Sequence, residues 1–178
     1  NRGVSISADL DYVLLQVGAR AVVVAEALVE PCAVRYGITD PVILATTKGD
    51  QLERLTVVPP FEDIDVPLML GSHVTTEAGT GCVHTAPAHG LEDFEIGKAY
   101  GLEVYNPVGG NGIYHPGTPV LEGKHIFRAN DEIVAELQAR GRLLAHKPYE
   151  HSYPHCWRHN TPIIFRATPP RLIGMSQG

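Results

Sequence analysis

Residues 79–94 read Gly-Thr-Gly-Cys-Val-His-Thr-Ala-Pro-Ala-His-Gly-Leu-Glu-Asp-Phe and combine a glycine-rich bend, two histidines and an acidic pair. The glycines at its start permit backbone conformations closed to other residues and let a ligand approach the main chain. Residues 82–85 are typical of a short strand, which Pro87 ends. From Leu91 the apolar spacing becomes helical and runs to a glycine stop at Gly101. The stretch therefore predicts a strand, a turn and a helix in direct succession.

This order places Asp93 in the first helical turn and His84 near the end of the strand. In one interpretation, Glu92 and Asp93 only complement the positive end of the helix dipole, as acids in a first turn often do. In the other, a strand-end histidine and a helix-start carboxylate face one cleft. There the carboxylate could hold a ligand ammonium group and the imidazole could contact a hydroxyl. The local sequence leaves both interpretations open.

The rest of the chain is rich in short strands. Besides 82–85, the predicted strands are 4–7, 12–17, 21–24, 41–46, 55–58, 66–70 and 74–76. Many short strands at close spacing favour a barrel or a sandwich. Two further helices are predicted: 26–36, with a kink or break caused by Pro31, and 131–140, capped by Asn130. The second helix has an apolar stripe that predicts a packing role, and the Gly-, Pro- and Asn-rich residues 106–117 predict a surface loop.

The composition is that of a globular domain with one core, with 178 residues of which 44% are hydrophobic and 19% charged. No apolar run is long enough to span a membrane and no secretory leader opens the chain, so a cytoplasmic location is expected. Three widely spaced cysteines argue against a disulfide framework and suit a reducing compartment.

The net charge of −6 is unevenly distributed along the chain. Residues 1–110 hold 6 Lys and Arg against 15 Asp and Glu, a balance of −9, whereas residues 111–178 hold 8 against 5, a balance of +3. Phosphate binding depends mainly on Lys and Arg, so contact with nucleic acid is expected from the C-terminal third. The candidate residues there are Lys124, Arg128, Arg140, Arg142, Lys147 and Arg158.

Two other groups of residues could form a reactive site, but the sequence supports them less well than it supports residues 79–94. Cys156 and His159 have the spacing of half a zinc site; His151 and His155 could join them, but no second pair at that spacing lies nearby, so no metal is expected. Cys82 lies two residues from a histidine, yet neighbours on one strand face are not guaranteed hydrogen-bond geometry. A core cysteine is expected there instead of a nucleophile.

Residues 79–94 closely resemble the signature of the editing domain, connective peptide 1, that is inserted in isoleucyl-tRNA synthetases of class I. Asn1-Arg2 resembles the end of this family's threonine-rich peptide, and residues 151–169 resemble the strand that returns to the synthetic core. Residues 106–114 and 127–131 also fit. The likeness therefore covers roughly residues 1–169.

The resemblance implies a mixed α and β, strand-rich fold with a barrel-like β core and flanking α-helices. It also implies an editing domain over residues 1–168, in which 146–168 form a return segment toward the synthetic core, followed by a divergent or artificial tail at 169–178. Because the threonine-rich peptide would precede Asn1, the chain is expected to be an excised fragment without the side chains that position water there.

The activity implied by the resemblance is post-transfer editing, in which water hydrolyses mischarged valyl-tRNA(Ile) and valine is released. One methylene is worth only about 1–3 kcal/mol of discrimination, a general magnitude known for synthetases of this kind, so a second site that excludes isoleucine completes the sorting. The implied partners are the aminoacylated 3′ end of tRNA(Ile) and the rest of the parent synthetase, with no membrane. No cofactor or metal is expected in the editing domain, since ATP and Mg²⁺ belong to the parent synthetic site.

Residue roles follow from the same resemblance. Asp93 is expected to bind the substrate α-ammonium, and His84 to limit the side-chain pocket and contact the terminal ribose; these two are the predicted catalytic residues. Asn1 is expected to face the water or the scissile ester. The other predicted substrate-binding residues, which would form the pocket wall, are Thr80, Gly81, Thr85, Ala86, Pro87 and His89. No covalent nucleophile is implied.

Two alternatives stay open. The editing domain of a valyl- or leucyl-tRNA synthetase shares the fold and acts on another mischarged amino acid, although the Val-His-Thr-Ala-Pro setting of His84 favours the isoleucyl member. A non-catalytic fragment would only bind tRNA ends or act as a spacer in the parent enzyme. Retained tRNA binding without ester hydrolysis would identify this second case.

Overall fold

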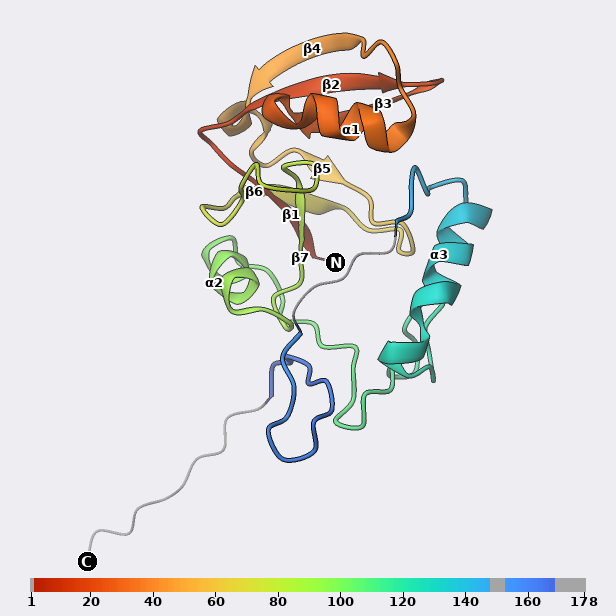
Figure 1. Cartoon of the computed structure of the whole chain (residues 1–178). Coiled ribbons are helices and arrows are strands. Elements are labelled where there is room, and N and C mark those ends of the chain that lie inside the picture. The colour runs from red at the N-terminus through yellow and green to blue at the C-terminus, as the bar shows by residue number, and fades with distance from the viewer. Residues whose placement is uncertain (1, 148–152, 169–178) are drawn as a thin grey trace, which may run out of the picture.

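The computed structural model describes residues 2–147 and 153–168, which form two β-sheets with helices around them (Figure 1). The first sheet has the order β5-β6-β1-β7, with β1 parallel to β6 and the other pairs antiparallel. Its strands are β1 Gly3–Ile6, β5 Thr56–Val57, β6 Val66–Leu70 and β7 Val83–Thr85. The second sheet is antiparallel and has the order β3-β2-β4. Its strands are β2 Asp11–Val17, β3 Arg20–Ala25 and β4 Ile43–Lys48.

The helices lie at three places around the sheets. In Figure 1, α1 lies against the three-stranded sheet, α2 lies below β7, and α3 stands to one side of the four-stranded sheet. The α-helices are α1 Val29–Tyr36, α2 Leu91–Ala99 and α3 Asn130–Ala139. The 3-10 turns are η1 Glu26–Leu28, η2 Gly49–Leu52 and η3 Ile126–Arg128. None of the described helices has the length and apolar character needed to cross a bilayer.

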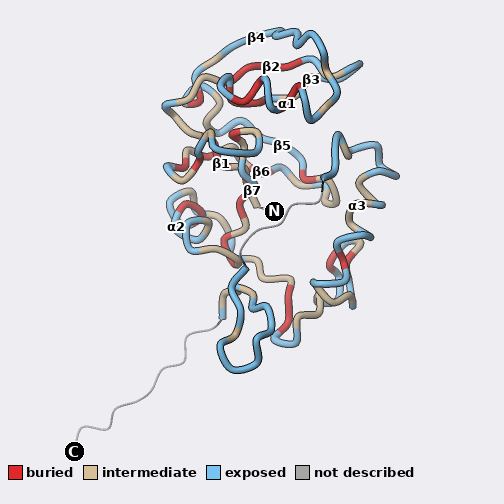
Figure 2. Tube along the Cα trace, viewed as in Figure 1, coloured by how far each residue is buried: buried red, intermediate tan, exposed pale blue. Residues whose placement is uncertain are grey.

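The core lies between α1 and the β2–β3 hairpin, where the apolar residues of three elements meet. Tyr12 and Leu15 of β2, Val24 of β3 and Cys32 of α1 are fully buried in one cluster. Figure 2 shows the buried trace concentrated in this region, whereas α3 has intermediate and exposed residues only. Because burial of apolar surface is the main driving force for folding, this hairpin and helix anchor the domain.

Tyr12 also connects the core to residues 79–85. Its hydroxyl accepts a hydrogen bond from the Ser7 amide at 2.9 Å and donates one to the Gly81 carbonyl at 2.7 Å. Burial raises the pKa of this phenol above its usual value. A buried hydroxyl with both a donor and an acceptor partner fixes the relative position of the two chain segments.

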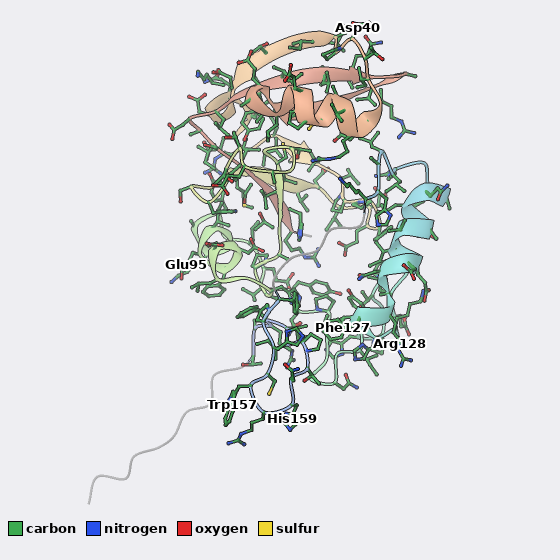
Figure 3. All side chains as sticks on the ribbon, in the orientation of Figure 1. Asp40, Glu95, Phe127, Arg128, Trp157 and His159 are labelled. Carbon is green, nitrogen blue, oxygen red and sulfur yellow. The ribbon has the colours of Figure 1, made fainter. Side chains whose placement is uncertain are left out.

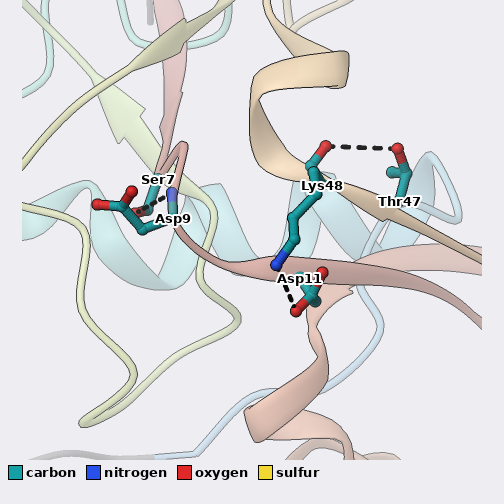
Figure 4. Close-up of polar contacts among 5 residues, drawn as sticks. All are labelled: Ser7, Asp9, Asp11, Thr47 and Lys48. Atoms are coloured by element: carbon teal, nitrogen blue, oxygen red, sulfur yellow. Dashed lines mark hydrogen bonds and ion pairs between the residues drawn. The ribbon is translucent and has the colours of Figure 1, made fainter.

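The start of β2 is tied to the end of β4 by an exposed ion pair (Figure 4). Lys48 Nζ donates to Asp11 Oδ2 at 2.8 Å, and the amide of Asp9 donates to Ser7 Oγ at 3.3 Å in the turn before β2. Such exposed pairs contribute about 0–1 kcal/mol each, so this contact orients the strand ends more than it stabilises the fold.

The mixed α and β, strand-rich fold predicted from the sequence is confirmed. The strands form two sheets, and no pairing recorded in residues 2–147 and 153–168 joins these into a closed barrel. The helix at 26–36 begins as η1 and becomes α1 at Val29, so the break precedes Pro31. Pro31 then occupies the first turn of α1, where its missing amide costs no intrahelical hydrogen bond.

Three local predictions were wrong or displaced. Residues 74–76 form no strand; the Val74 amide instead donates to the Gly71 carbonyl in a turn. The strand predicted at 41–46 is β4, shifted to 43–48 because its last residues pair with Tyr12 and Asp11. Asn130 is the first residue of α3 and not its cap; the cap is Ala129, without a side-chain hydrogen bond.

Candidate functional site

A cavity of about 590 Å³ lies beside β7 and the loop that follows it. A volume in this range accommodates a small molecule or a nucleoside ester. Its lining is mostly apolar, with a few charged or imidazole side chains. The lining residues are Arg2, Pro59, Pro60, Phe61, Glu62, His84, Ala86, His89, Tyr105, Pro107, Val108, Tyr114, Thr118, Pro119, Leu121, Ile126, Ile133, Leu137 and Ile164.

The end of β7 brings three of the predicted site residues to this cavity. His84 is exposed and belongs to the lining, together with Ala86 and His89 from the loop before α2. The His89 amide donates to the Ala86 carbonyl at 2.8 Å, which makes the loop a tight turn. The strand-to-helix connection therefore presents two imidazoles and a small side chain to one cavity.

Asp93 lies beside this cavity and does not line it. From the first turn of α2 its Oδ2 accepts a hydrogen bond from the Ala86 amide at 3.1 Å. Its other carboxylate oxygen has no hydrogen-bond partner among residues 2–147 and 153–168. The carboxylate thus holds the loop against the helix and keeps one oxygen available next to the cavity wall.

Thr85 follows His84 on β7, so its side chain lies on the opposite face of the sheet, and it does not line the cavity. It is fully buried, and its Oγ1 lies 2.6 Å from Ser5 Oγ, a hydrogen bond between β7 and β1. Pro87 is likewise buried and packs against α2, where a Cβ on Gly97 would come within 2.6 Å of the proline ring. Thr85 and Pro87 therefore do not line the cavity but hold β7 and the following loop against β1 and α2.

Thr80 and Gly81 lie at the other end of β7, against β3. The Thr80 carbonyl accepts a hydrogen bond from the Ala25 amide at 2.8 Å. Gly81 has φ of +76°, and a Cβ there would lie 2.6 Å from Ala25 Cβ. Neither residue is in the cavity lining, and Asn1 lies outside the described residues.

Residues 164–167 of the return segment pack against the loop between β7 and α2. The His89 Nδ1 lies 3.0 Å from the Phe165 carbonyl oxygen, and the Ala167 amide donates to the Ala88 carbonyl. Asn106 Nδ2 donates to the Ala167 carbonyl at 2.9 Å. The segment at 164–167 is therefore held against the histidine-bearing loop, and Ile164 contributes to the cavity wall.

Several cavity residues were missed from the sequence. Residues 106–117, predicted as a surface loop, place Pro107, Val108 and Tyr114 in the wall, and Val108 is buried. A bridge between Val108 and Tyr114 folds the loop inward, and burial raises the pKa of the Tyr114 phenol. Apolar and aromatic residues within a glycine-rich stretch are the signal that could have shown this role.

The helix for which a packing role was predicted also lines the cavity. Ile133 and Leu137 of α3 face the cavity, although none of the helix residues is buried. Arg140, next to the helix end, contacts the far wall: its guanidinium lies 5.4 Å from the Phe61 ring centroid and Nη1 donates to the Pro60 carbonyl at 3.3 Å. The apolar stripe therefore faces a cavity and not a solid core.

Arg2 supplies a positive charge to the wall. Its guanidinium lies 4.2 Å from the Tyr105 ring centroid, and Nη1 is 3.9 Å from Glu62 Oε1. The Arg2 amide donates to the Thr85 carbonyl at 2.9 Å, which fixes the residue at the edge of β1. These partners are far from Arg2 along the chain, which explains why the local sequence did not predict this group.

Cys82 does not form a nucleophile with His84. Its Sγ lies 3.7 Å from the Val23 carbonyl oxygen, and the side chain packs against the core cluster. Burial raises the pKa of the thiol to about 11. Because the thiolate is the reactive form, this raised pKa disfavours a role of Cys82 as a nucleophile.

Cys156 and His159, the predicted half of a zinc site, contact each other without a further metal ligand among the described residues. Cys156 Sγ lies 3.4 Å from His159 Nδ1, while His155 Nδ1 is 2.7 Å from the Tyr153 carbonyl oxygen. Within the described ranges no three His, Cys, Asp or Glu side chains gather closely enough to hold a metal ion. His151 lies outside those ranges, and the absence of a metal stays a prediction.

Comparison with known proteins found a matching family model and a solved structure of similar fold. The family model described as leucyl-tRNA synthetase, editing domain, matches residues 26–113. The crystal structure of GlLeuRS-CP1 superposes with a TM-score of 0.65 over 83% of this chain and 79% of that chain. At 12% sequence identity, this second likeness concerns the fold alone.

Curated relatives are far closer in sequence. The isoleucine-tRNA ligase of Shewanella sp. (strain W3-18-1) is 55% identical over 179 residues, which covers 98% of this chain. That of Pseudoalteromonas atlantica (strain T6c / ATCC BAA-1087) is 52% identical over 181 residues, or 99% of this chain. The chain spans 19% of the length of each relative. The chain therefore belongs to the family of aminoacyl-tRNA synthetase editing domains, in the branch carried by isoleucine-tRNA ligases.

Proposed function

We propose that this domain hydrolyses the ester of mischarged valyl-tRNA(Ile) within an isoleucine-tRNA ligase. The observation that carries the proposal is the juxtaposition of His84, Ala86 and Asp93: two of them line a cavity of about 590 Å³, and the third is hydrogen-bonded to the loop in its wall. The relatives are named isoleucine-tRNA ligases, which supports tRNA(Ile) as the proposed tRNA. Valine is the proposed amino acid because it is one methylene smaller than isoleucine. Water, the aminoacylated tRNA end and the rest of the ligase are the proposed reactants and partners.

Asp93 is the proposed binding group for the α-ammonium of the ester. Its Oδ2 is engaged by the Ala86 amide, and the second oxygen can accept a charge-assisted hydrogen bond from an ammonium group. An amino acid anchored in this way would place its carbonyl near Ala86. His84 would then limit the space for the side chain and contact the ribose.

The proposed nucleophile is water. Its oxygen attacks the ester carbonyl, the bond from that carbon to the ribose oxygen breaks, and the ribose oxygen takes a proton to give free valine and tRNA. A positioned water gains from proximity and orientation. The high pKa of Cys82 and its contact with β3 argue against a thiol ester intermediate.

The other proposed substrate-binding residues divide into two groups by position. Ala86 and His89 line the cavity and could touch the substrate directly. Thr80, Gly81, Thr85 and Pro87 lie behind the loop or against β3, so we assign them the support of the loop that carries His84. Asn1 keeps its expected role at the ester as a prediction.

A panel of mischarged tRNAs tests the proposal against its alternatives. The chain and a full-length ligase that carries it are each given valyl-tRNA(Ile), threonyl-tRNA(Val) and a mischarged tRNA(Leu), and release of the amino acid is followed. Preferential discharge of valyl-tRNA(Ile) is expected. Preference for tRNA(Val) or tRNA(Leu) would assign the domain to another synthetase, and tRNA binding without discharge by either protein would make it a non-catalytic module.

A further inference from the structure

A second hollow lies on the opposite side of the cavity wall. It is lined by Ile113, Gly123, His125, Phe127 and Arg128. The wall between the two is the paired backbone of 113–114 and 125–126, since Ile113 bridges to His125 while their neighbours Tyr114 and Ile126 line the cavity. Ile113 and Tyr114 are successive residues of extended backbone and present their side chains to opposite sides, and Ile126 begins η3 directly after His125. The two surfaces therefore share one backbone wall.

The hollow presents an aromatic face beside an unpaired cation. Phe127 is 46% exposed, and its ring centroid lies 5.6 Å from that of His125, with the planes at 37°. The Phe127 amide donates to His125 Nδ1 at 3.3 Å, which fixes the two residues relative to each other. Arg128 is exposed, and no side-chain partner is recorded for it in residues 2–147 and 153–168. Figure 3 shows Phe127 and Arg128 together at the foot of α3.

Two nearby carboxylates are engaged elsewhere, and no ion pair joins Arg128 to Asp131 in residues 2–147 and 153–168. Glu132 of α3 is paired with Lys124, and Glu122 Oε2 accepts a hydrogen bond from the Gly117 amide at 2.8 Å. Arg128 therefore has no recorded ion pair in the described residues, and it lies in the part of the chain with a balance of +3. An exposed aromatic ring next to a free guanidinium is the combination that binds single-stranded nucleic acid, by stacking on bases and by contact with phosphate.

The geometry points to His125, Phe127 and Arg128 as a binding site for the unpaired nucleotides that precede the terminal nucleoside of a tRNA end. One base stacks on the Phe127 ring and Arg128 binds a phosphate, while the terminal nucleoside enters the cavity across the shared wall. This site rests on the proposed function for the identity of its ligand. It adds a contact outside the cavity, and it gives a specific role to Arg128, one of the basic residues expected from the sequence to contact nucleic acid.

A matched pair of residues on the same molecule offers a control. Trp157 is 85% exposed, and the Arg158 guanidinium lies 4.7 Å from its ring centroid, so the chemistry is the same. Figure 3 shows Trp157 and His159 at the tip of the return segment, away from the foot of α3. Neither Trp157 nor Arg158 lines the cavity or the hollow.

The test is a titration of the 178-residue chain with the trinucleotide CCA and with AMP, followed by NMR chemical shifts. Phe127→Ala is expected to weaken CCA binding about five-fold or more and to leave AMP binding unchanged, because stacking on one base is lost. Phe127→Tyr retains the affinity. Arg128→Gln lowers the slope of log affinity against log salt by about 0.7, and Trp157→Ala has no effect.

Unchanged CCA binding in Phe127→Ala, or a loss in Trp157→Ala instead, would overturn the assignment, as would a wild-type chain that binds CCA no better than AMP. Because Phe127 is about half exposed, Phe127→Ala is expected to unfold at the same midpoint as the wild type. Equal midpoints would exclude a folding defect as the cause of weaker binding. Hydrolysis is scored separately, with valyl-tRNA(Ile) and a full-length ligase that carries this domain. CCA binding that depends on Phe127, together with no hydrolysis, would reject the editing activity and keep this site. Hydrolysis together with CCA binding that does not depend on Phe127 would reject this site and keep the editing activity.

Discussion

Asp93 uses one carboxylate oxygen in a structural hydrogen bond, while its other oxygen stays available beside the cavity. The bond to the Ala86 amide is the contact that the helix-dipole interpretation did not include. No side-chain cap is recorded at the start of α2, whose cap residue is Gly90. The position of this one residue therefore connects the loop, the helix and the cavity wall.

Replacement of Asp93 separates the structural contact from the charge. Asp93→Asn keeps an oxygen for the Ala86 amide and loses the negative charge, whereas Asp93→Ala loses both. If the charge holds the substrate ammonium, kcat/KM for deacylation of valyl-tRNA(Ile) falls about 10- to 100-fold in both variants, the range for a lost charge-assisted hydrogen bond. Full activity in Asp93→Asn would assign the residue to loop support only.

The buried pair of Ser5 and Thr85 makes a second prediction, on stability. Thr85→Val leaves the Ser5 hydroxyl buried without its partner, so the free energy of unfolding falls by about 1–3 kcal/mol. The double variant Ser5→Ala with Thr85→Val removes both polar groups and is expected to recover part of that loss. Urea unfolding of the wild type, both single variants and the double variant measures this coupling, and a fully additive result would mean that the two hydroxyls do not interact.

At the scale of the elements, the sequence was most informative where the pattern was local. The β2–β3 hairpin, α2 and α1 follow from apolar spacing and from glycines at their ends, as at Gly18 and Gly101. The failures are long-range in origin: β4 is displaced to suit its pairing with β2, and residues 74–76 find no partner strand.

The same distinction holds for the candidate site. His84, Ala86, His89 and Asp93 lie within ten residues, so their proximity followed from one strand-turn-helix pattern. The wall formed by Arg2, Tyr105 and α3 depends on contacts between distant segments, which residue spacing does not predict.

Two glycines in the bend before β7 share a backbone conformation but differ in the space around them, which makes them a useful pair for comparison. Gly79 and Gly81 have φ of +81° and +76°, but a Cβ would meet nothing within 4 Å at Gly79 and would lie 2.6 Å from Ala25 Cβ at Gly81. Gly79→Ala is expected to cost about 1–2 kcal/mol of unfolding free energy from the backbone conformation. Gly81→Ala is expected to cost about 1–3 kcal/mol more through the clash. Equal unfolding midpoints for the two variants would contradict this account.

The helices differ in how well they are held. In α1, Val29, Cys32 and Ala33 are buried, whereas none of the residues of α3 is. Local opening depends on buried apolar contacts, so amide hydrogen exchange is expected to be faster in α3 than in α1. Comparable protection of both helices would mean that α3 is packed more firmly than its exposure indicates.

At the scale of the whole molecule, the hairpin-and-helix core lies at one end, and loops and α3 lie toward the other (Figure 1). The cavity is lined mainly by residues of these loops and of α3. Most of the cavity wall comes from connections and not from the core, which fits a stable scaffold that carries a substrate site on its loops. The expectations of one domain over residues 1–168, of a cytoplasmic location and of no cofactor in this domain stay predictions. The tail at 169–178 lies outside the described residues.

The proposed editing activity is tested most directly by the initial rate of amino acid release from valyl-tRNA(Ile) and from isoleucyl-tRNA(Ile), measured on a full-length ligase that carries this domain. A site that limits side-chain size beside His84 predicts rapid release of valine and release of isoleucine close to the rate in buffer. Equal release of both amino acids, or release of neither above the rate in buffer, would contradict the assignment of this cavity as the editing site.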